Sequence, residues 1–113
     1  EVYTIEIVEP LASQAQDVLK ELKNQNIRFR TGDGYKGWPE AAPFDKIIVT
    51  AAPPMVPQPL LDQLKSGGRM IIPVGRWNQE LLLIRHTPDG YQREHVFPVR
   101  FVPMTGVAQK ERR

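Results

Sequence analysis

The apolar run "FDKIIVTAA", residues 44–52, restricts the fold of this chain more than any other segment. Positions 47–49 carry consecutive large apolar residues, a pattern typical of a strand buried on both faces. Such strands occur mainly in parallel sheets whose two faces are covered by helices. The run therefore predicts an α/β protein built around a parallel sheet.

The periodicity before this run predicts a strand, a helix and a second strand. Residues 2–8 alternate as a strand, and Glu9 followed by Pro10 favours a helix start, because proline suits the first helical turn. Apolar residues at helical spacing then continue to Leu22. A short strand is expected at 27–30, ahead of a glycine-rich turn.

The second half predicts a helix, a strand and an antiparallel hairpin. Pro59 can begin the helix and Gly67 is expected to end it, before the strand "RMIIPVG" at 69–75. Residues 80–102 hold two β-rich runs around "TPDG", with Pro88 at a favoured turn position and Gly90 closing the turn. This order predicts a mostly parallel sheet that ends in a carboxyl-terminal antiparallel hairpin.

Composition limits the function classes. The 113 residues are 41% hydrophobic and 25% charged, which suits one compact domain. The net charge is only +2, and much of the basic surplus lies in "QKERR" at 109–113, so we expect a charged solvated tail and no nucleic-acid partner. The absence of cysteine excludes disulfides, thiolate metal sites and a cysteine nucleophile.

No metal or membrane signal is present in the sequence. His86 and His95 lie in strand-like runs without ligand spacing, so we expect structural roles for both and no metal site. No apolar run approaches the ~18 residues of a membrane-spanning helix, and no signal-peptide pattern opens the chain. We expect a soluble, cytoplasmic protein with no membrane partner.

Acidic side chains follow the first two predicted strands, where open α/β sheets bind their ligands. Glu6 lies near the end of the first strand, and a carboxylate there can accept two hydrogen bonds from the vicinal hydroxyls of a ribose. The alternatives are an acid that faces solvent or one that begins the helix, a role that Glu9 fits better. Both interpretations of Glu6 stay open.

The turn "TGDGYKGW", residues 31–38, contains the second acid, Asp33. Because Gly32 and Gly34 flank it, the backbone can approach a planar group while the carboxylate accepts from an exocyclic amine. The same composition is also that of an ordinary turn. For Tyr35 and Trp38, we expect packing rather than ligand stacking.

Several strings, taken in order, identify a family resemblance. "VYTIEIVEP", "GDG", "APFD", "VTAAPP", "LKSGGRMIIPVG" and "RFVP" resemble the carboxyl-terminal half of protein-L-isoaspartate O-methyltransferases, over residues 2 to 106. The resemblance implies a partial class I methyltransferase fold, which is Rossmann-like. Residues 1–108 would be the carboxyl-terminal part of a domain dependent on S-adenosylmethionine, and 109–113 the tail. The family esterifies the carboxyl group of isoaspartyl residues in damaged proteins.

The resemblance also implies cofactor-binding residues. Glu6 matches the acid that holds the ribose hydroxyls, and Asp33 with Gly34 matches the element beside the adenine. Thr50 and Ala51 would lie near the methionine end of the cofactor and the site of methyl transfer.

For the substrate, the resemblance implies that Val102 and Pro103 help to cradle the isoaspartyl peptide. No catalytic residue is carried over, because the serine-containing substrate segment of the family does not occur in this sequence. The chemistry needs no strong base, since a carboxylate is already ionised at neutral pH and the methyl carbon of a sulfonium is already activated. Catalysis should come from alignment in a site that partly excludes water.

The family's glycine-rich loop, Glu-x-Gly-x-Gly-x-Gly, is also absent, together with the strand before it; "GDGYKG" does not replace it. That strand would lie between the strands at 2–8 and 45–50, so its omission should leave unpaired edges and exposed apolar faces. The chain could be a portion of a complete enzyme, could receive the strand from a partner chain, or could self-associate by rearrangement. We favour the first, and expect residues 1–113 alone to be inactive.

The sequence opens at Glu1 without methionine, which we interpret as a processed start or as part of a longer protein. Two other functions stay open. One is a non-catalytic binding or assembly module descended from this fold. The other is a methyltransferase for a small-molecule acceptor, against which "RFVP" argues modestly.

Overall fold

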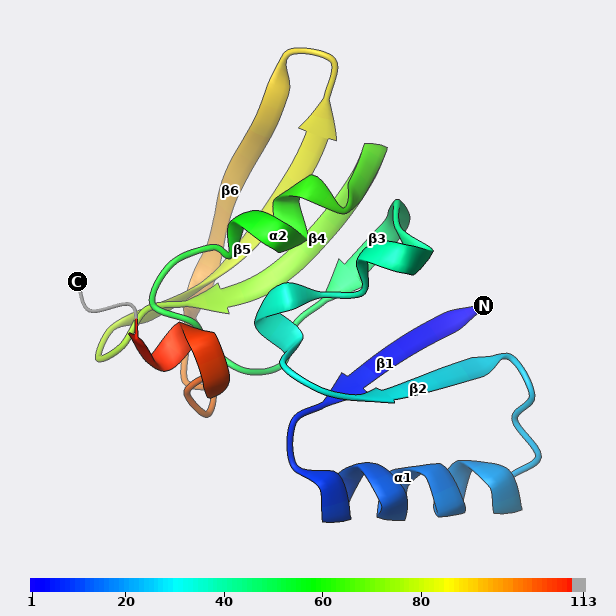
Figure 1. The fold of residues 1–113 in the computed structure, drawn as a ribbon. Helices are drawn as coiled ribbons and strands as arrows, with labels where there is room; N and C mark the ends of the chain where they lie inside the picture. Colours follow the sequence, from blue (N-terminus) through cyan, green and yellow to red (C-terminus); the bar gives the residue numbers. More distant parts are fainter. Residues whose placement is uncertain (111–113) are drawn as a thin grey trace.

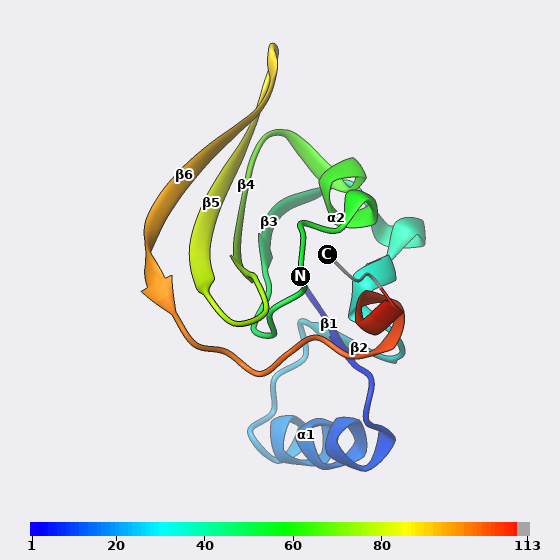
Figure 2. The same ribbon diagram turned by 90° about the vertical axis from the view of Figure 1, so that its left-hand side faces the viewer.

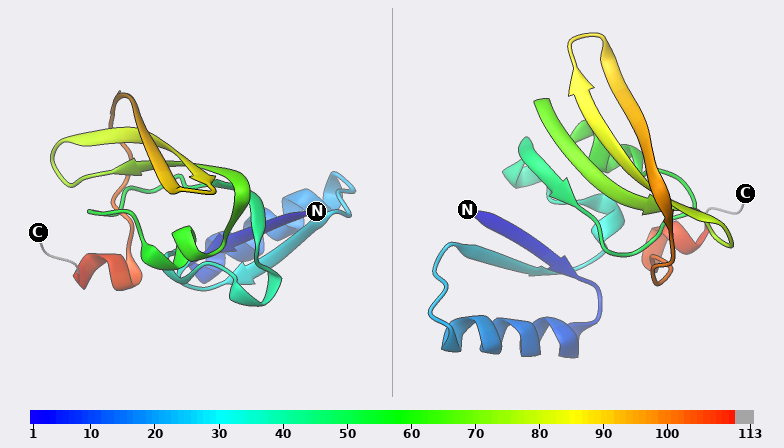
Figure 3. Two further views of the ribbon diagram at one scale, coloured as in Figure 1. Left: turned by 90° about the horizontal axis from the view of Figure 1, so that it is seen from above. Right: turned by 180° about the vertical axis from the view of Figure 1, so that it is seen from behind.

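The strands form two separate hydrogen-bonded sheets in the computed structural model, which describes residues 1–110 (Figure 1). The smaller sheet has the order β1-β2, and the larger has the order β3-β4-β5-β6. The views in Figure 3 show the smaller sheet and its helix beside the larger sheet. The α/β arrangement predicted from the sequence is therefore present, divided between two sheets.

The first unit is a parallel strand pair with its connecting helix. β1 (Val2–Glu6) leads into α1 (Glu9–Glu21), and the chain returns as β2 (Ile27–Thr31), which pairs with β1 in parallel register. α1 begins after Val8, with Pro10 in its first turn. Backbone N–H groups in the first turn have no hydrogen-bond acceptor within the helix, so the absence of this group in proline costs nothing there. The predicted helix start is confirmed, while the first strand is two residues shorter than expected.

The larger sheet combines one parallel pair with an antiparallel meander. Its elements are β3 (Phe44–Ile48), α2 (Gln58–Asp62), β4 (Leu64–Val74), β5 (Gln79–Thr87) and β6 (Gly90–Val99). β3 and β4 are parallel, and β4, β5 and β6 are antiparallel in succession. Thr87 pairs with Gly90 across the turn, so the predicted hairpin is confirmed. The sheet curves around α2 (Figure 2).

The core lies between α2 and the inner face of β4 and β5. Met70, Ile72 and Ile84 are fully buried, and Leu60 and Leu61 from α2 pack against them. The burial of each apolar side chain of this size contributes about 1.5–3 kcal/mol to the free energy of folding. This cluster is therefore the main source of stability in the larger sheet.

The second helix is shorter than the sequence predicts. α2 ends at Asp62, and Gly67, expected to end it, lies within β4 with a φ of 85°. The strand begins at once because Leu64 is buried and pairs with Phe44, and the register of β3 and β4 shifts just beyond this pair. The glycines permit this irregularity: a side chain at Gly68 would collide with the Asp45 carbonyl oxygen, 2.8 Å away.

β3 is not buried on both faces, contrary to the expectation from its apolar run. Ile48 is 74% exposed, whereas Ile47 packs against the core on the other face. α1 likewise has no buried residue, and its apolar Leu11 and Val18 are about half exposed. The helix therefore lies against only one thin sheet. The exposed apolar faces expected from the omission of a central strand are present.

The remaining chain contains short 3-10 turns and a carboxyl-terminal segment. The turns are η1 (Gly34–Lys36), η2 (Pro39–Ala41) and η3 (Gly106–Lys110). η3 includes the first two residues of the predicted charged tail; residues 111–113 lie outside the described part of the chain. Within residues 1–110, no helix is long and apolar enough to cross a membrane.

The histidines make structural contacts, as predicted. His86 Nδ1 lies 2.8 Å from the Leu64 carbonyl oxygen, and the His86 ring stacks on Tyr91 at 4.5 Å. His95 contacts Glu80. Across the described residues, no group of three or more acidic or histidine side chains could hold a metal ion.

Candidate functional site

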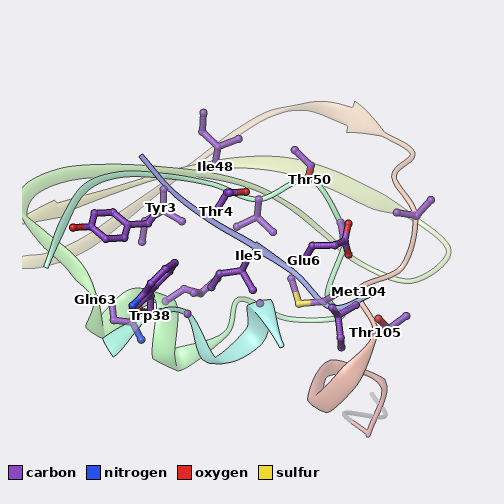
Figure 4. A pocket seen from close by; sticks show the side chains of 18 of the residues that line it. Tyr3, Thr4, Ile5, Glu6, Trp38, Ile48, Thr50, Gln63, Met104 and Thr105 are labelled. Carbon is purple, nitrogen blue, oxygen red and sulfur yellow. Dashed lines mark hydrogen bonds between the residues drawn. The ribbon is translucent and has the colours of Figure 1, made fainter. Parts of the chain in front are cut away.

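A cleft of about 580 Å³ separates the two sheets. Its walls come from β1, from the end of β3 and the residues after it, from the turn around Trp38, and from the carboxyl-terminal segment around Met104. In Figure 4, Trp38 and Gln63 lie towards one end of the cleft, and Glu6, Thr50 and Thr105 towards the other. Segments far apart in the sequence therefore meet in one cavity.

The facing edges of β1 and β3 are both open. Among the described residues, β1 pairs only with β2, and β3 pairs only with β4. Their arrows run in a similar direction in Figures 1 and 3, and residues of both strands line the cleft; we call the space between the two strands the slot. This is where the resemblance predicts the omitted glycine-loop strand.

Glu6 lies at the end of β1 and lines the cleft. Its Oε2 accepts a hydrogen bond of 3.2 Å from the backbone N–H of Val8, the residue that precedes α1. Glu9 instead accepts from the Ser13 hydroxyl on the outside of the helix. Glu6 therefore does contribute to the helix entry, and its carboxylate keeps acceptor positions for a ligand in the cleft.

Asp33 is not among the residues that line the cleft. Its Oδ1 accepts from the N–H of Tyr35 at 3.0 Å, which caps η1, and its Oδ2 accepts from the N–H of Val107 at 2.8 Å. Gly34, the next residue, does line the cleft. The bond to Tyr35 fits the ordinary turn that the sequence left open as an alternative, whereas the bond to Val107 was not predicted.

The residues after β3 and the carboxyl-terminal segment meet at Ala52. Thr50 and Ala51 line the cleft directly after the strand, and Val102 and Pro103 of the carboxyl-terminal segment also line it. The two segments are joined because Ala52 forms an isolated parallel bridge with Pro103. The expected methyl-transfer and substrate regions are therefore adjacent in the fold.

Comparison with known proteins gives a consistent result. The family model for protein-L-isoaspartate(D-aspartate) O-methyltransferase (PCMT) matches residues 1–109. The chain belongs to the PCMT family. It is 53% identical over 107 residues to a protein-L-isoaspartate O-methyltransferase of Gloeobacter violaceus, covering 93% of this chain and 52% of that protein. It is also 56% identical over 108 residues to protein-L-isoaspartate O-methyltransferase 1 of Nitrosospira multiformis, covering 93% of this chain and 46% of that protein.

Solved PCMT structures have the same fold. One protein-L-isoaspartate O-methyltransferase superposes with a TM-score of 0.87 at 30% identity, covering 93% of this chain and 34% of its own. A putative PCMT from Plasmodium falciparum, solved in complex with S-adenosyl-L-homocysteine, gives a TM-score of 0.81 at 27% identity. That match covers 92% of this chain and 52% of the Plasmodium chain. The predicted partial methyltransferase fold is confirmed, and the chain spans about half the length of its curated PCMT relatives.

The PCMT cleft also contains residues that the sequence did not single out. Gln63 is 6% exposed; its Oε1 accepts from the Trp38 N–H at 2.8 Å, and its Nε2 donates to the Lys36 carbonyl at 2.9 Å. Gly37 allows this approach, because an added Cβ would lie 2.8 Å from Gln63 Cδ. Gln63 gives no local signal in the sequence, since its partners lie about 25 positions earlier in the chain.

Trp38 packs as predicted, although it also borders the cleft. Its ring meets Tyr3 edge-on at 5.1 Å between centroids, and the Arg30 guanidinium lies 4.2 Å above it. Arg30 in turn pairs with Glu40. These contacts join the turn after β2 to β1 and fix one end of the cleft.

Proposed function

We propose that this chain is the part of a protein-L-isoaspartate O-methyltransferase that flanks the cofactor ribose, the adenine and the substrate. The complete enzyme would transfer a methyl group from S-adenosylmethionine to the carboxylate of L-isoaspartyl residues in damaged proteins. One observation carries the proposal: a single cleft between β1 and β3 is lined both by the predicted cofactor residue Glu6, at the end of β1, and by the predicted substrate residue Pro103.

The residues of the cleft fit the proposed cofactor. A carboxylate at the end of β1 suits vicinal hydroxyls, and within residues 1–110 only one acceptor position of Glu6 is used, by the Val8 N–H. Gly34 presents backbone without a side chain, with no atom within 4 Å of an added Cβ, so a planar ring can approach it. We therefore assign Glu6 to the ribose and Gly34 to the adenine side. From the resemblance we also assign Asp33, which lies outside the cleft lining, to the adenine side, and Thr50 with Ala51 to the methionine end.

The chain's contribution to catalysis would be alignment. The cofactor supplies an electrophilic methyl group, and the isoaspartyl carboxylate is already ionised at neutral pH, so no side chain needs to remove a proton. Thr50 and Ala51 would limit the position of the reacting carboxylate, while the adjacent Val102 and Pro103 hold the peptide. Holding the reactants in line and excluding water can together account for a large part of such a rate enhancement.

Several parts of the proposal concern the complete protein. Residues 1–108 would form the carboxyl-terminal part of the methyltransferase domain, followed by the tail at 109–113. Isoaspartyl peptides and proteins would be its partners, and the cytoplasm its location. With the slot between β1 and β3 open, we expect residues 1–113 alone to transfer no methyl group; self-association through that slot is the expected alternative if the chain is a true fragment.

The test begins with the residues encoded upstream of Glu1. A strand that ends in the glycine-rich loop, after a serine-containing substrate segment, is the expected result. A start codon directly before Glu1 would contradict the enzyme assignment and favour a non-catalytic module. Labelling of a small carboxylic acid in place of an isoaspartyl peptide would instead favour the small-molecule alternative.

A further inference from the structure

The carboxylate of Asp33 joins two segments that are 74 positions apart in the sequence. One oxygen accepts from the Tyr35 N–H within its own turn, and the other accepts from the Val107 N–H at the start of η3. Each bond is charge-assisted, and such bonds are about twice as strong as neutral ones. The side chain therefore attaches the carboxyl-terminal segment to the turn after β2.

Gly106 makes this attachment possible. Its φ is 84°, a conformation that side chains rarely adopt, and an added Cβ would lie 2.6 Å from Cγ of Asp33. Because both oxygens of this short side chain are held by backbone donors, the carboxylate could not move aside without losing a bond. A side chain at position 106 would therefore disrupt the attachment.

We call residues 102–107 the strap. Its first end is held by Ala52, whose N–H donates to the Val102 carbonyl at 2.7 Å and whose carbonyl accepts from the Met104 N–H at 2.9 Å. Its second end is held by Asp33 through Val107. Residues 102–105 line the cleft, and the Ala52 bonds fall on two of them, Val102 and Met104. The strap is thus fixed within its cleft-lining portion by Ala52 and just beyond that portion by Asp33.

We propose that Asp33 is a positioning residue that holds the strap in place against the substrate peptide. This rests on the proposed function, because the strap carries the predicted substrate residues Val102 and Pro103. The role differs from a contact with adenine: each carboxylate oxygen has a further lone pair, so Asp33 can hold the strap whether or not it also accepts from a ligand. Without Asp33, the second end of the strap is released while the Ala52 attachment remains.

The test uses the complete methyltransferase and a matched pair of glycine variants. Gly106→Ala inserts a Cβ against the Asp33 carboxylate. Gly67→Ala is the control, because Gly67 has a φ of 85°, close to the 84° of Gly106, and no atom within 4 Å of an added Cβ. The two substitutions impose similar backbone strain, and only Gly106→Ala disturbs the attachment.

The first measurement is hydrogen exchange at the Val107 amide, which needs no enzymatic activity. Exchange should accelerate about tenfold or more in Asp33→Ala and Gly106→Ala, because the amide loses its acceptor. Gly67→Ala should retain the protection of the unchanged protein. A Val107 amide that stays equally protected in both Asp33→Ala and Gly106→Ala overturns the proposal.

The second measurement is the KM for an isoaspartyl peptide at saturating S-adenosylmethionine, where cofactor affinity no longer limits the rate. Gly106→Ala should raise this KM about tenfold with a smaller change in kcat, and Gly67→Ala should leave both unchanged. Faster exchange at Val107 with an unchanged KM overturns the positioning role. If the unchanged enzyme methylates no isoaspartyl peptide, the proposed function fails, and exchange at Val107 alone decides for or against the Asp33 attachment.

Discussion

The amide of Ala52 donates a hydrogen bond of 2.7 Å to the carbonyl of Val102. Ala52 is 2% exposed and follows the strand β3, whereas Val102 is 68% exposed and begins the strap. A backbone contact with a buried residue therefore positions an exposed apolar residue at the cleft. Changes to the Val102 side chain should affect what the cleft binds and should leave this backbone contact intact.

Val102→Ser in the complete methyltransferase should raise the KM for isoaspartyl peptides several-fold, because an exposed apolar contact for the peptide is lost. The free energy of unfolding should change by less than about 0.5 kcal/mol, as is usual for exposed positions. Val96→Ser on β6, a position 40% exposed and outside the cleft lining, is the control. Equal KM values for the two variants would remove Val102 from the substrate site.

Glu6→Gln should weaken S-adenosylmethionine binding by about 1–3 kcal/mol, because the ribose hydroxyls would lose a charged acceptor. Isothermal titration of the cofactor measures this directly. Glu9→Gln is a matched control, since Glu9 lies three positions on, bonds to Ser13 and does not line the cleft. If both variants bind the cofactor with the affinity of the unchanged protein, the ribose assignment is wrong.

Asp33→Ala should also weaken cofactor binding, by about 1–3 kcal/mol, if its carboxylate accepts from the adenine amine. Asp89→Ala, in the exposed hairpin turn between β5 and β6, provides a control acid remote from the cleft. Unchanged cofactor affinity in a folded Asp33→Ala variant would defeat the adenine role. Its backbone bonds to Tyr35 and Val107 would then be the contacts that account for this side chain.

Ile48→Ala should destabilise the complete methyltransferase by about 2–5 kcal/mol, the cost of truncating a buried aliphatic side chain. This is expected although Ile48 is 74% exposed in the present chain, because under the proposal the remainder of the complete enzyme should cover the outer face of β3. Urea unfolding of Ile48→Ala beside Ile84→Ala, whose side chain is fully buried here, provides the comparison. A cost below about 0.5 kcal/mol for Ile48→Ala would indicate that nothing covers this face.

Local sequence signals predicted much of the fold. Pro10 marked the start of α1, and "TPDG" marked the turn between β5 and β6, because both depend on backbone preferences of a few neighbouring residues. The predicted end of α2 was wrong. Glycine is a common residue at the end of a helix, so Gly67 was expected there, but the pairing of Leu64 with Phe44 begins β4 before that position. This pairing is a long-range contact, which the local sequence does not indicate.

The site was predictable only in part. Resemblance and strand-end position indicated Glu6, Thr50 and Pro103, all of which line the cleft. The bond from Val107 to Asp33 had no local signal, because its two residues are brought together by the whole chain path. The exposure of Ile48 likewise depends on which strands are present beside β3, which its own apolar run cannot indicate.

The central claim is tested most directly by methyl transfer from labelled S-adenosylmethionine to an isoaspartyl peptide and to its normal aspartyl counterpart. The complete protein should label the isoaspartyl peptide and not the aspartyl one, and residues 1–113 alone should label neither. Equal labelling of both peptides by the complete protein would contradict the assigned specificity, and labelling of neither would contradict the assigned activity.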